Sequence, residues 1–238
     1  MFRFVFIFFD TLSAGFAVAA LVMLCFDWRR LPRVFVIALP WLAPMTLTLW
    51  LSASTVRGHI MAILYAVQTT VFALAGLEAW RRLGRPGLPW TRRLVGERDT
   101  VRSGARRWLI DTLLVLSCSM AWTMLLPRFI VKSNVHVPVT ALNLVYAPVR
   151  EELLYRLGIQ GVIVRLTRGR TWSIPLAIGI SSLMWGLNHQ TAWRLVELVP
   201  AGIALGWLQV RHGTESCMVA HAGFNMAVFI RRASLAVG

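Results

Sequence analysis

FVFIFFDTLSAGFAVAALVMLCF (Phe4–Phe26) is a run of 23 residues in which Asp10 is the only charged side chain. A helix that crosses the hydrocarbon core of a membrane needs roughly 20 mostly apolar residues. The run is long enough to span, and it continues well past the small residues that would end a cleaved signal peptide. We therefore expect a retained membrane-spanning helix here.

Seven more apolar segments follow, so the sequence predicts an all-α fold, a multi-pass transmembrane helical bundle of about eight spans. The later expected spans are Val34–Val56, His59–Trp80, Trp108–Pro127, Pro138–Leu166, Thr171–Gln190, Trp193–Val210 and Glu215–Ile230. Residues 1–130 would hold the first four spans and an Arg-rich loop, residues 81–107. Residues 135–232 would hold the last four, and together they would form a single integral membrane domain.

The composition excludes the soluble classes. Hydrophobic residues make up 57% of the chain and charged residues 15%, and the mean hydropathy is +0.64. A soluble domain of this size cannot bury that much apolar surface. The net charge is +15, but the basic residues are scattered between apolar runs, whereas nucleic-acid binders gather them on one surface. Three widely separated cysteines form neither a disulfide framework nor a CxxC metal site.

The fifth expected span carries four charges, Arg150, Glu151, Glu152 and Arg156. Each charge in hydrocarbon costs at least about 2.5–3.5 kcal/mol, so such residues usually have a function. Glu152 and Arg156 have the i,i+4 order that favours an intrahelical ion pair. Glu151 is turned about 100° away from Glu152. A buried carboxylate without a full charge partner can act as a general base.

Matching polar groups lie in the later spans: His189 near the end of the sixth, and His221 with Asn225 on one face of the eighth. Imidazole and carboxamide groups placed together can bind a developing oxyanion or orient a water molecule. Two alternatives need no chemistry. The arginines and glutamates could simply neutralise one another, and the histidines could be packing residues.

The segments EELLYR (Glu151–Arg156), WGLNH (Trp185–His189) and HAGFN (His221–Asn225) resemble three motifs of one family. They are the EExxxR, FxxxH and HxxxN/D motifs of the CPBP (Abi) intramembrane proteases, which include the type II CAAX prenyl endopeptidase. The resemblance covers about Ala141–Ile230. Trp185 replaces the usual Phe, and Leu157 stands where Gly often follows the Arg. These departures concern substrate fit more than catalysis.

The resemblance implies an intramembrane endopeptidase without a cofactor. Its expected catalytic residues are Glu151 and His189, which would activate a water, His221 and Asn225, which would stabilise the oxyanion, and Glu152 and Arg156, which would hold the site together. The family was long labelled metalloprotease, so zinc held by Glu151, His189 and His221 stays open. The chain has no HExxH motif, which favours the metal-free glutamate mechanism.

The expected partners are membrane lipid and a protein or peptide substrate with a membrane-associated C-terminus, such as a prenylated CAAX-type tail or a sorting tail. No nucleic acid is expected, and the expected location is a bacterial cytoplasmic membrane. An alternative is a non-proteolytic immunity or chaperone-type protein on the same scaffold. A transporter is a third, although we find no internal repeat. Gly179–Ser182 is similar to a rhomboid serine motif, but its last residue does not fit.

The remaining isolated polar residues are predicted to have no role in the site. Asp10 and Asp111 lack a visible partner in the sequence, so we expect them near the membrane interface or at helix ends. His59, His136 and His212 fall at span ends or in loops and are expected to be solvated.

Overall fold

The chain is all-α, as the sequence predicts. The computed structural model describes residues 2–94, 96, 105–126, 141–189 and 192–237, and within these ranges it contains helices and turns but no strand. The N-terminal elements are α1 (Phe2–Phe26), the 3-10 helix η1 (Trp28–Arg30), α2 (Leu31–Ser52), α3 (Val56–Arg82), α4 (Pro89–Leu94) and α5 (Ala105–Leu125). The C-terminal elements are α7 (Ala141–Glu151), the π-helix η2 (Glu152–Ile159), α8 (Gln160–Leu166), α9 (Ser173–Asn188), α10 (Ala192–His212) and α11 (Thr214–Val237).

In the described part of the chain, three helices are long and apolar enough to cross a membrane: Trp28–Leu51, Val56–Arg82 and Ala105–Leu125. Leu12–Phe26 and Ser173–Asn188 are apolar but shorter. The prediction of about eight spans is therefore not confirmed. In the stretch formed by α7, η2 and α8, the charged residues that predict a site also make the helix too polar to count as a span.

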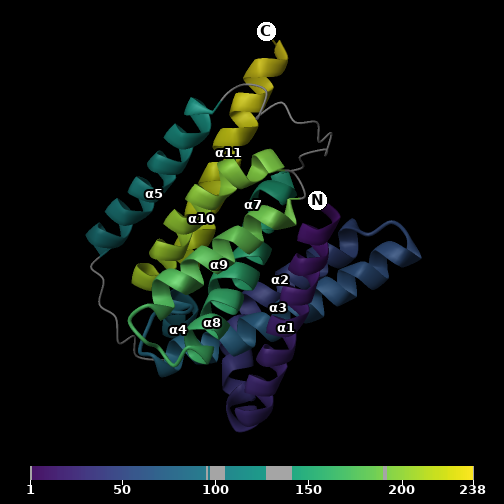
Figure 1. Ribbon diagram of the computed structural model, residues 1–238, viewed down its shortest axis with the longest axis vertical. Coiled ribbons are helices and arrows are strands. Elements are labelled where there is room, and N and C mark those ends of the chain that lie inside the picture. The colour runs from purple at the N-terminus through teal and green to yellow at the C-terminus, as the bar shows by residue number, and fades with distance from the viewer. Residues whose placement is uncertain (1, 95, 97–104, 127–140, 190–191, 238) are drawn as a thin grey trace.

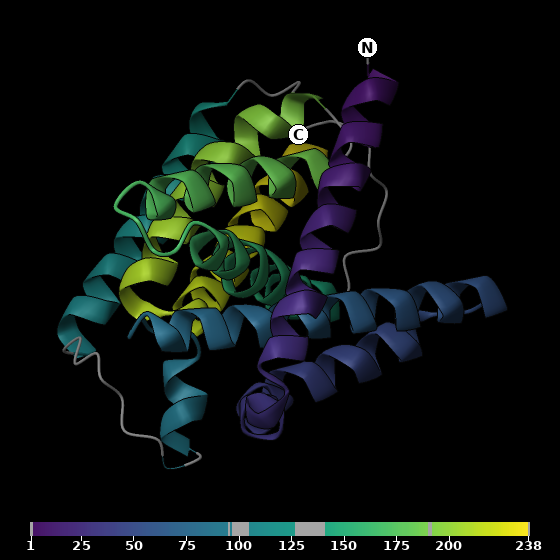
Figure 2. The same ribbon diagram turned by 60° about the horizontal axis from the view of Figure 1, so that its bottom comes forward.

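Two groups of helices meet at the middle of the molecule. α9 packs on α10, and α10 and α5 both pack on α11, as Figure 1 shows. α2 pairs with α3, and Figure 2 shows these two helices extending together to one side of the bundle, with α1 crossing them. The other part of α3 packs on η2 and α8. α3 therefore connects the N-terminal helices to the charged stretch.

The contact of α3 with η2 and α8 is so close that it requires glycine. A Cβ on Gly76 would lie 1.8 Å from the carbonyl oxygen of Leu157, and a Cβ on Gly161 would lie 2.8 Å from the Cα of Gly76. Small residues of this kind let membrane helices pack backbone to backbone. One turn further along α3, the buried indole of Trp80 donates to the carbonyl of Arg156 at 3.4 Å. α3 thus fixes where the charged helix lies.

Asp111 and His212 do not behave as the sequence analysis expects. His212 is only 3% exposed, and its Nε2 lies 2.7 Å from Oδ2 of Asp111. The pair joins α5 to the end of α10, so Asp111 has a partner and His212 is not solvated. The expectation was wrong because residues 101 positions apart meet only through helix packing. The side chain of Asp10 and residue His136 lie outside what the structure describes.

Candidate active site

The two adjacent glutamates lie where the helix changes its geometry. α7 ends at Glu151, and the π-helical segment η2 starts at Glu152. π-Helical turns bond residue i to i+5, are rare, and occur frequently at functional sites. Glu151 is 7% exposed and Glu152 1% exposed. Two consecutive carboxylates are therefore held inside the protein at this junction.

Glu152 is bound from two sides. Its Oε2 lies 3.3 Å from Nε of Arg156, as the i,i+4 spacing predicts. Its Oε1 lies 2.8 Å from Nδ1 of His221 on α11. Arg156 is fully buried and also donates from Nη1 to Oγ of Ser181 on α9 at 3.3 Å. This polar cluster ties η2 to α9 and α11, the two helices that carry the remaining site residues.

Glu151 has different neighbours. The indole Nε1 of Trp185 donates to its Oε2 at 2.5 Å. Arg150 forms an ion pair with its Oε1 at 3.5 Å, and Nε2 of His221 lies 3.9 Å from Oε2. The expectation that Glu151 faces away from the Glu152–Arg156 pair is confirmed. His221 lies between the two carboxylates, with one ring nitrogen facing each.

A cavity of about 210 Å³ brings four of the six predicted site residues together. Its polar lining includes Glu151 from α7, His189 from the end of α9, and His221 and Asn225 from α11. Apolar side chains line the rest, namely Leu144, Ala147, Leu198, Phe224, Val228 and Phe229. Glu152 and Arg156 do not line this cavity and lie behind its wall. The structure therefore separates the six residues into four that line the cavity and a buried ion pair that does not.

The ring of His189 is oriented by its own helix. His189 follows the last residue of α9, and its Nδ1 lies 3.0 Å from the carbonyl oxygen of Trp185. A carbonyl oxygen only accepts hydrogen bonds, so we assign the proton to Nδ1. Nε2 then keeps a lone pair, which can accept a proton or a hydrogen bond in the cavity.

Sequence reasoning missed two members of the site, Trp185 and Arg194. Trp185 was interpreted as a substitute for Phe that affects substrate fit, yet its N–H holds Glu151 and its ring meets both histidines edge to face. The guanidinium of Arg156 lies over the same ring, 5.2 Å from its centroid. Arg194 also lines the cavity and pairs with Glu197 on its own helix. The signal for Trp185 was its indole N–H, which a buried Trp must pair.

The zinc ligation left open by the sequence gains no support from the residues that the structure describes. Among them, no group of three or more His, Cys, Asp or Glu side chains is placed to hold a metal ion. The three residues left open as ligands also have other hydrogen-bonded neighbours: Trp185 for Glu151, the Trp185 carbonyl for His189 and Glu152 for His221. In both histidines the bonded atom is Nδ1, an arrangement that also occurs in metal sites, so the absence of zinc stays a prediction.

Comparison with known proteins covers this part of the chain. Residues 133–227 match the family model described as type II CAAX prenyl endopeptidase Rce1-like. No curated protein and no solved structure matches the chain significantly. The matched segment contains all six predicted site residues, Glu151, Glu152, Arg156, His189, His221 and Asn225. The buried carboxylates and the two histidines therefore lie in the segment of the chain that is similar to the Rce1-like type II CAAX prenyl endopeptidases, a family of membrane proteases.

Proposed function

We propose that this protein is an intramembrane endopeptidase that cleaves membrane-associated peptides with a water activated by glutamate. The observation that carries the proposal is the shared cavity, in which Glu151, His189, His221 and Asn225 converge from three helices. A general base, a second proton carrier and two groups for an oxyanion are the parts that peptide hydrolysis needs. The match to a protease family supports the same reaction.

In the proposed reaction, Glu151 takes a proton from a water molecule that His189 orients through Nε2. The resulting hydroxide adds to the carbonyl carbon of the substrate peptide bond, and the carbonyl oxygen becomes an oxyanion. The hydrogen bond from Trp185 to Oε2 and the ion pair with Arg150 at Oε1 fix the Glu151 carboxylate. A base fixed in this way needs no reorganisation before it reacts.

His221 and the side-chain amide of Asn225 would donate to the oxyanion. In this proposal Glu152 accepts a hydrogen bond from Nδ1 of His221, and the carboxylate thereby orients the imidazole so that an Nε2–H can donate to the oxyanion. The tetrahedral intermediate then collapses, the C–N bond breaks, and protonated Glu151 gives its proton to the leaving amine. The products are a carboxylic acid and an amine.

The proposed substrates have a membrane-associated C-terminal part, such as a prenylated CAAX-type tail or a sorting tail. The proposed location is a bacterial cytoplasmic membrane. The apolar side chains of the cavity, including Leu198 and Phe224, suit a substrate segment that arrives from the lipid. Hydrophobic side chains exposed on the outer faces of α2, α3 and α5 would contact the lipid.

The activity test uses the purified full-length chain in lipid vesicles with membrane-anchored reporter peptides, and mass spectrometry detects the products. We expect cleavage by the wild type, with and without a chelator, and loss of cleavage in His189→Ala and Asn225→Ala. Cleavage that stops with the chelator and returns with zinc would contradict the metal-free mechanism. Full cellular function in both variants and in Glu151→Ala would favour the non-proteolytic immunity or chaperone-type alternative.

The hydrogen bond between Trp185 and Glu151 predicts a specific effect on turnover. Trp185→Phe keeps an aromatic ring at this position but removes the N–H that donates to Oε2. Because a hydrogen bond to a charged group contributes about 1.5–3 kcal/mol, we expect kcat to fall about tenfold or more and KM to change little. Steady-state kinetics on the reporter peptide provide both values.

A matched control is Trp207→Phe on α10, the same chemical change outside the cavity. The ring of Trp207 is half-buried and lies 4.6 Å from the guanidinium carbon of Arg211. This variant should keep the wild-type kcat. If Trp185→Phe also kept it, the indole N–H would have no part in holding the base.

A further inference from the structure

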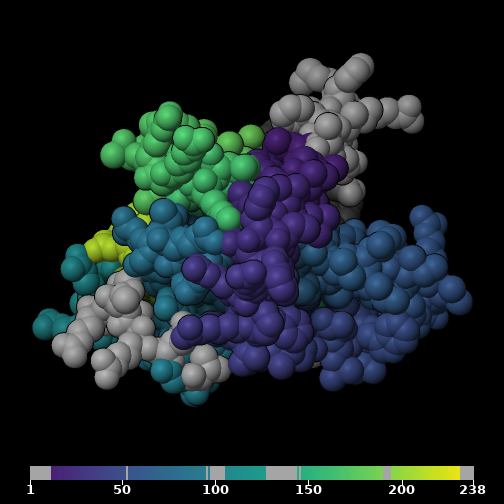
Figure 3. Space-filling model, turned by 90° about the horizontal axis from the view of Figure 1, so that it is seen from below, coloured from purple at the N-terminus to yellow at the C-terminus, as the bar shows by residue number. Residues whose placement is uncertain are grey.

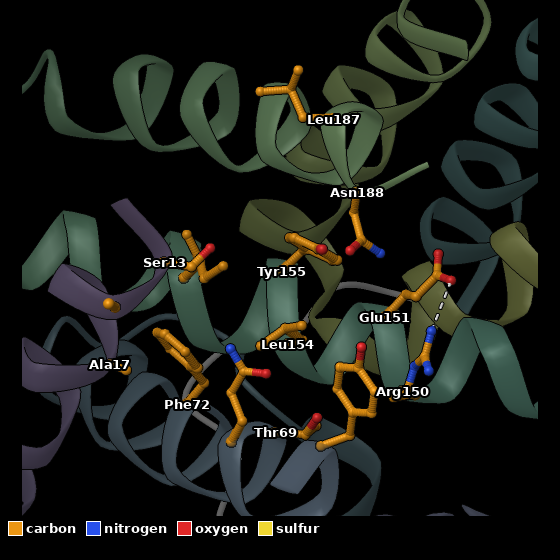
Figure 4. A pocket seen from close by; sticks show the side chains of 14 residues that line it. Ser13, Ala17, Thr69, Phe72, Arg150, Glu151, Leu154, Tyr155, Leu187 and Asn188 are labelled. Atoms are coloured by element: carbon orange, nitrogen blue, oxygen red, sulfur yellow. Dashed lines mark ion pairs between the residues drawn. The ribbon is translucent and has the colours of Figure 1, made fainter. Parts of the chain in front are cut away.

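A second, larger cavity lies on the other side of Glu151. Its volume is about 570 Å³, and it is enclosed by α1, α3, the junction of α7 and η2, and the end of α9. Figure 4 shows the residues that line it, among them Ser13, Thr69 and Asn188, which come from three different helical segments. α1 forms its outer wall, and Figure 3 shows this helix (purple) lying between the green and blue segments of the same face. The mechanism proposed above uses Glu151 and Arg150 from the wall of this cavity but gives the space itself no role.

The two cavities share one wall, and that wall carries the proposed reacting groups. Glu151 lines both cavities. At the end of α9, Asn188 lines the larger cavity and the next residue, His189, lines the smaller one. A peptide whose scissile bond lies between Glu151 and His189 can therefore extend in two directions. One part contacts the apolar cavity, and the other contacts Arg150 and Asn188.

The larger cavity has the lining of a site for polar peptide. Besides Glu151 and Tyr155, six of its residues carry hydrogen-bonding side chains, namely Ser13, Tyr65, Gln68, Thr69, Arg150 and Asn188. Tyr155 adds its hydroxyl. Polar groups inside a protein are paired, so an apolar lipid chain would leave these donors and acceptors unsatisfied. The amide and hydroxyl groups match the N–H and C=O groups of a peptide main chain.

Arg150 gives the cavity its charge preference. Among the described residues that line it, Arg150 is the one cation. The described contacts of its guanidinium are the 3.5 Å ion pair with Glu151 and the ring of Tyr65, whose centroid lies 5.9 Å away. A guanidinium has five N–H donors in a planar fork that fits a carboxylate. One ion pair longer than a normal hydrogen bond uses few of them.

We propose that this cavity is a substrate subsite for the polar stretch on one side of the scissile bond, in which Arg150 binds a carboxylate of the substrate. The inference rests on the proposed proteolysis and specifies the substrate class. A carboxylate can come from the free C-terminus of the peptide or from an Asp or Glu side chain. Both sources present the same chemistry to Arg150, and the experiment separates them.

The experiment compares three peptides of one sequence in the vesicle assay: a free C-terminal acid, the C-terminal amide, and the amide with one Glu in the tail. We expect wild-type kcat/KM to be about tenfold higher for at least one carboxylate peptide than for the plain amide. In Arg150→Gln this ratio should fall to about one. The ratio cancels any general loss of activity caused by the lost ion pair with Glu151.

Arg194→Gln is the matched control, because Arg194 is a cation in the smaller cavity. It should keep the wild-type ratio even if it lowers the overall rate. Arg150→Lys retains the positive charge and should keep part of the preference. If the wild type cleaves all three peptides with equal kcat/KM, the subsite is wrong and the proteolysis stands. A preference for the free acid alone identifies the C-terminus as the ligand.

If no peptide is cleaved, a binding measurement tests the subsite proposal independently of the protease proposal. The same three peptides, labelled with a fluorophore, are titrated with wild-type protein and with Arg150→Gln. About tenfold tighter binding of a carboxylate peptide to the wild type, lost in the variant, would support the subsite while the protease proposal fails. Equal binding of all three peptides would overturn both.

Discussion

Glu151→Gln is expected to abolish peptide cleavage while the chain stays folded and inserted. Gln has nearly the same shape as Glu and its carbonyl oxygen can still accept the hydrogen bond from Trp185. It cannot take a proton from water, so the step that generates hydroxide is lost. General-base catalysis contributes about 10²–10⁴-fold, and we expect kcat to fall by about 10³-fold. Single-turnover cleavage of the reporter peptide measures this loss without interference from product release.

Asp111→Asn is the matched carboxylate control. Asp111 is also buried and ion-paired, but its partners are His212 and Arg211 on α10 rather than groups of the cavity. We expect a lower temperature of unfolding and an unchanged kcat. A Glu151→Gln protein that retains cleavage within about tenfold of the wild type would show that another group activates the water.

Arg156→Met is expected to have the largest effect on stability. Arg156 is fully buried and pairs with Glu152, which is 1% exposed. Met fills a similar volume, but the buried carboxylate of Glu152 would lose its arginine partner and retain the contact with His221. Removing one partner of a buried ion pair typically costs about 3–5 kcal/mol, so we expect little folded protein. Size-exclusion profiles and thermal unfolding in detergent measure the loss.

The double variant Glu152→Gln/Arg156→Met tests that explanation. It removes both charges, so much of the lost stability should return although cleavage should not. Arg82→Met is a more exposed counterpart: its side chain is 42% exposed and pairs with Glu78 and Asp27. Because each of these carboxylates keeps at least one other arginine partner, we expect a smaller loss of stability than in Arg156→Met. A single Arg156→Met variant as stable as the wild type would mean that the pair does not hold the helix together.

The local part of the site could be predicted from the sequence. The i,i+4 spacing of Glu152 and Arg156 places the two side chains next to each other on a helix, and the structure confirms the ion pair. The motif positions also indicated that His189, His221 and Asn225 belong with Glu151, and these residues line one cavity. Their roles in catalysis remain predictions that the variants above test.

The non-local part could not be predicted in this way. The hydrogen bond from Trp185 to Glu151 spans 34 positions, and the contact between His212 and Asp111 spans 101. Hydropathy places each of these residues along its own helix but does not say which helix faces which. A charged or polar residue at a span end therefore looks solvated in the sequence even when a neighbouring helix covers it.

The number of spans and the π-helix also could not be predicted from the hydrophobic pattern of the sequence. Apolar length predicted about eight spans, whereas three described helices meet the length and apolarity of a span. No residue between Glu152 and Ile159 signals a π-helix, because its geometry depends on packing against α3. Gly76 in α3 does not reveal a close helix contact in the sequence, because the residue that it contacts, Leu157, is known only from the structure.

The contact at Gly76 means that a helix from the first half of the chain packs directly against the backbone of the charged helical stretch in the second half. The family match begins at residue 133, yet the helical segment that carries Glu152 packs at Leu157 against Gly76, more than 50 residues before that boundary. A fragment limited to the matched residues would lack the surface on which its π-helix rests. A transplant of the matched residues into another membrane scaffold would therefore also have to include α3.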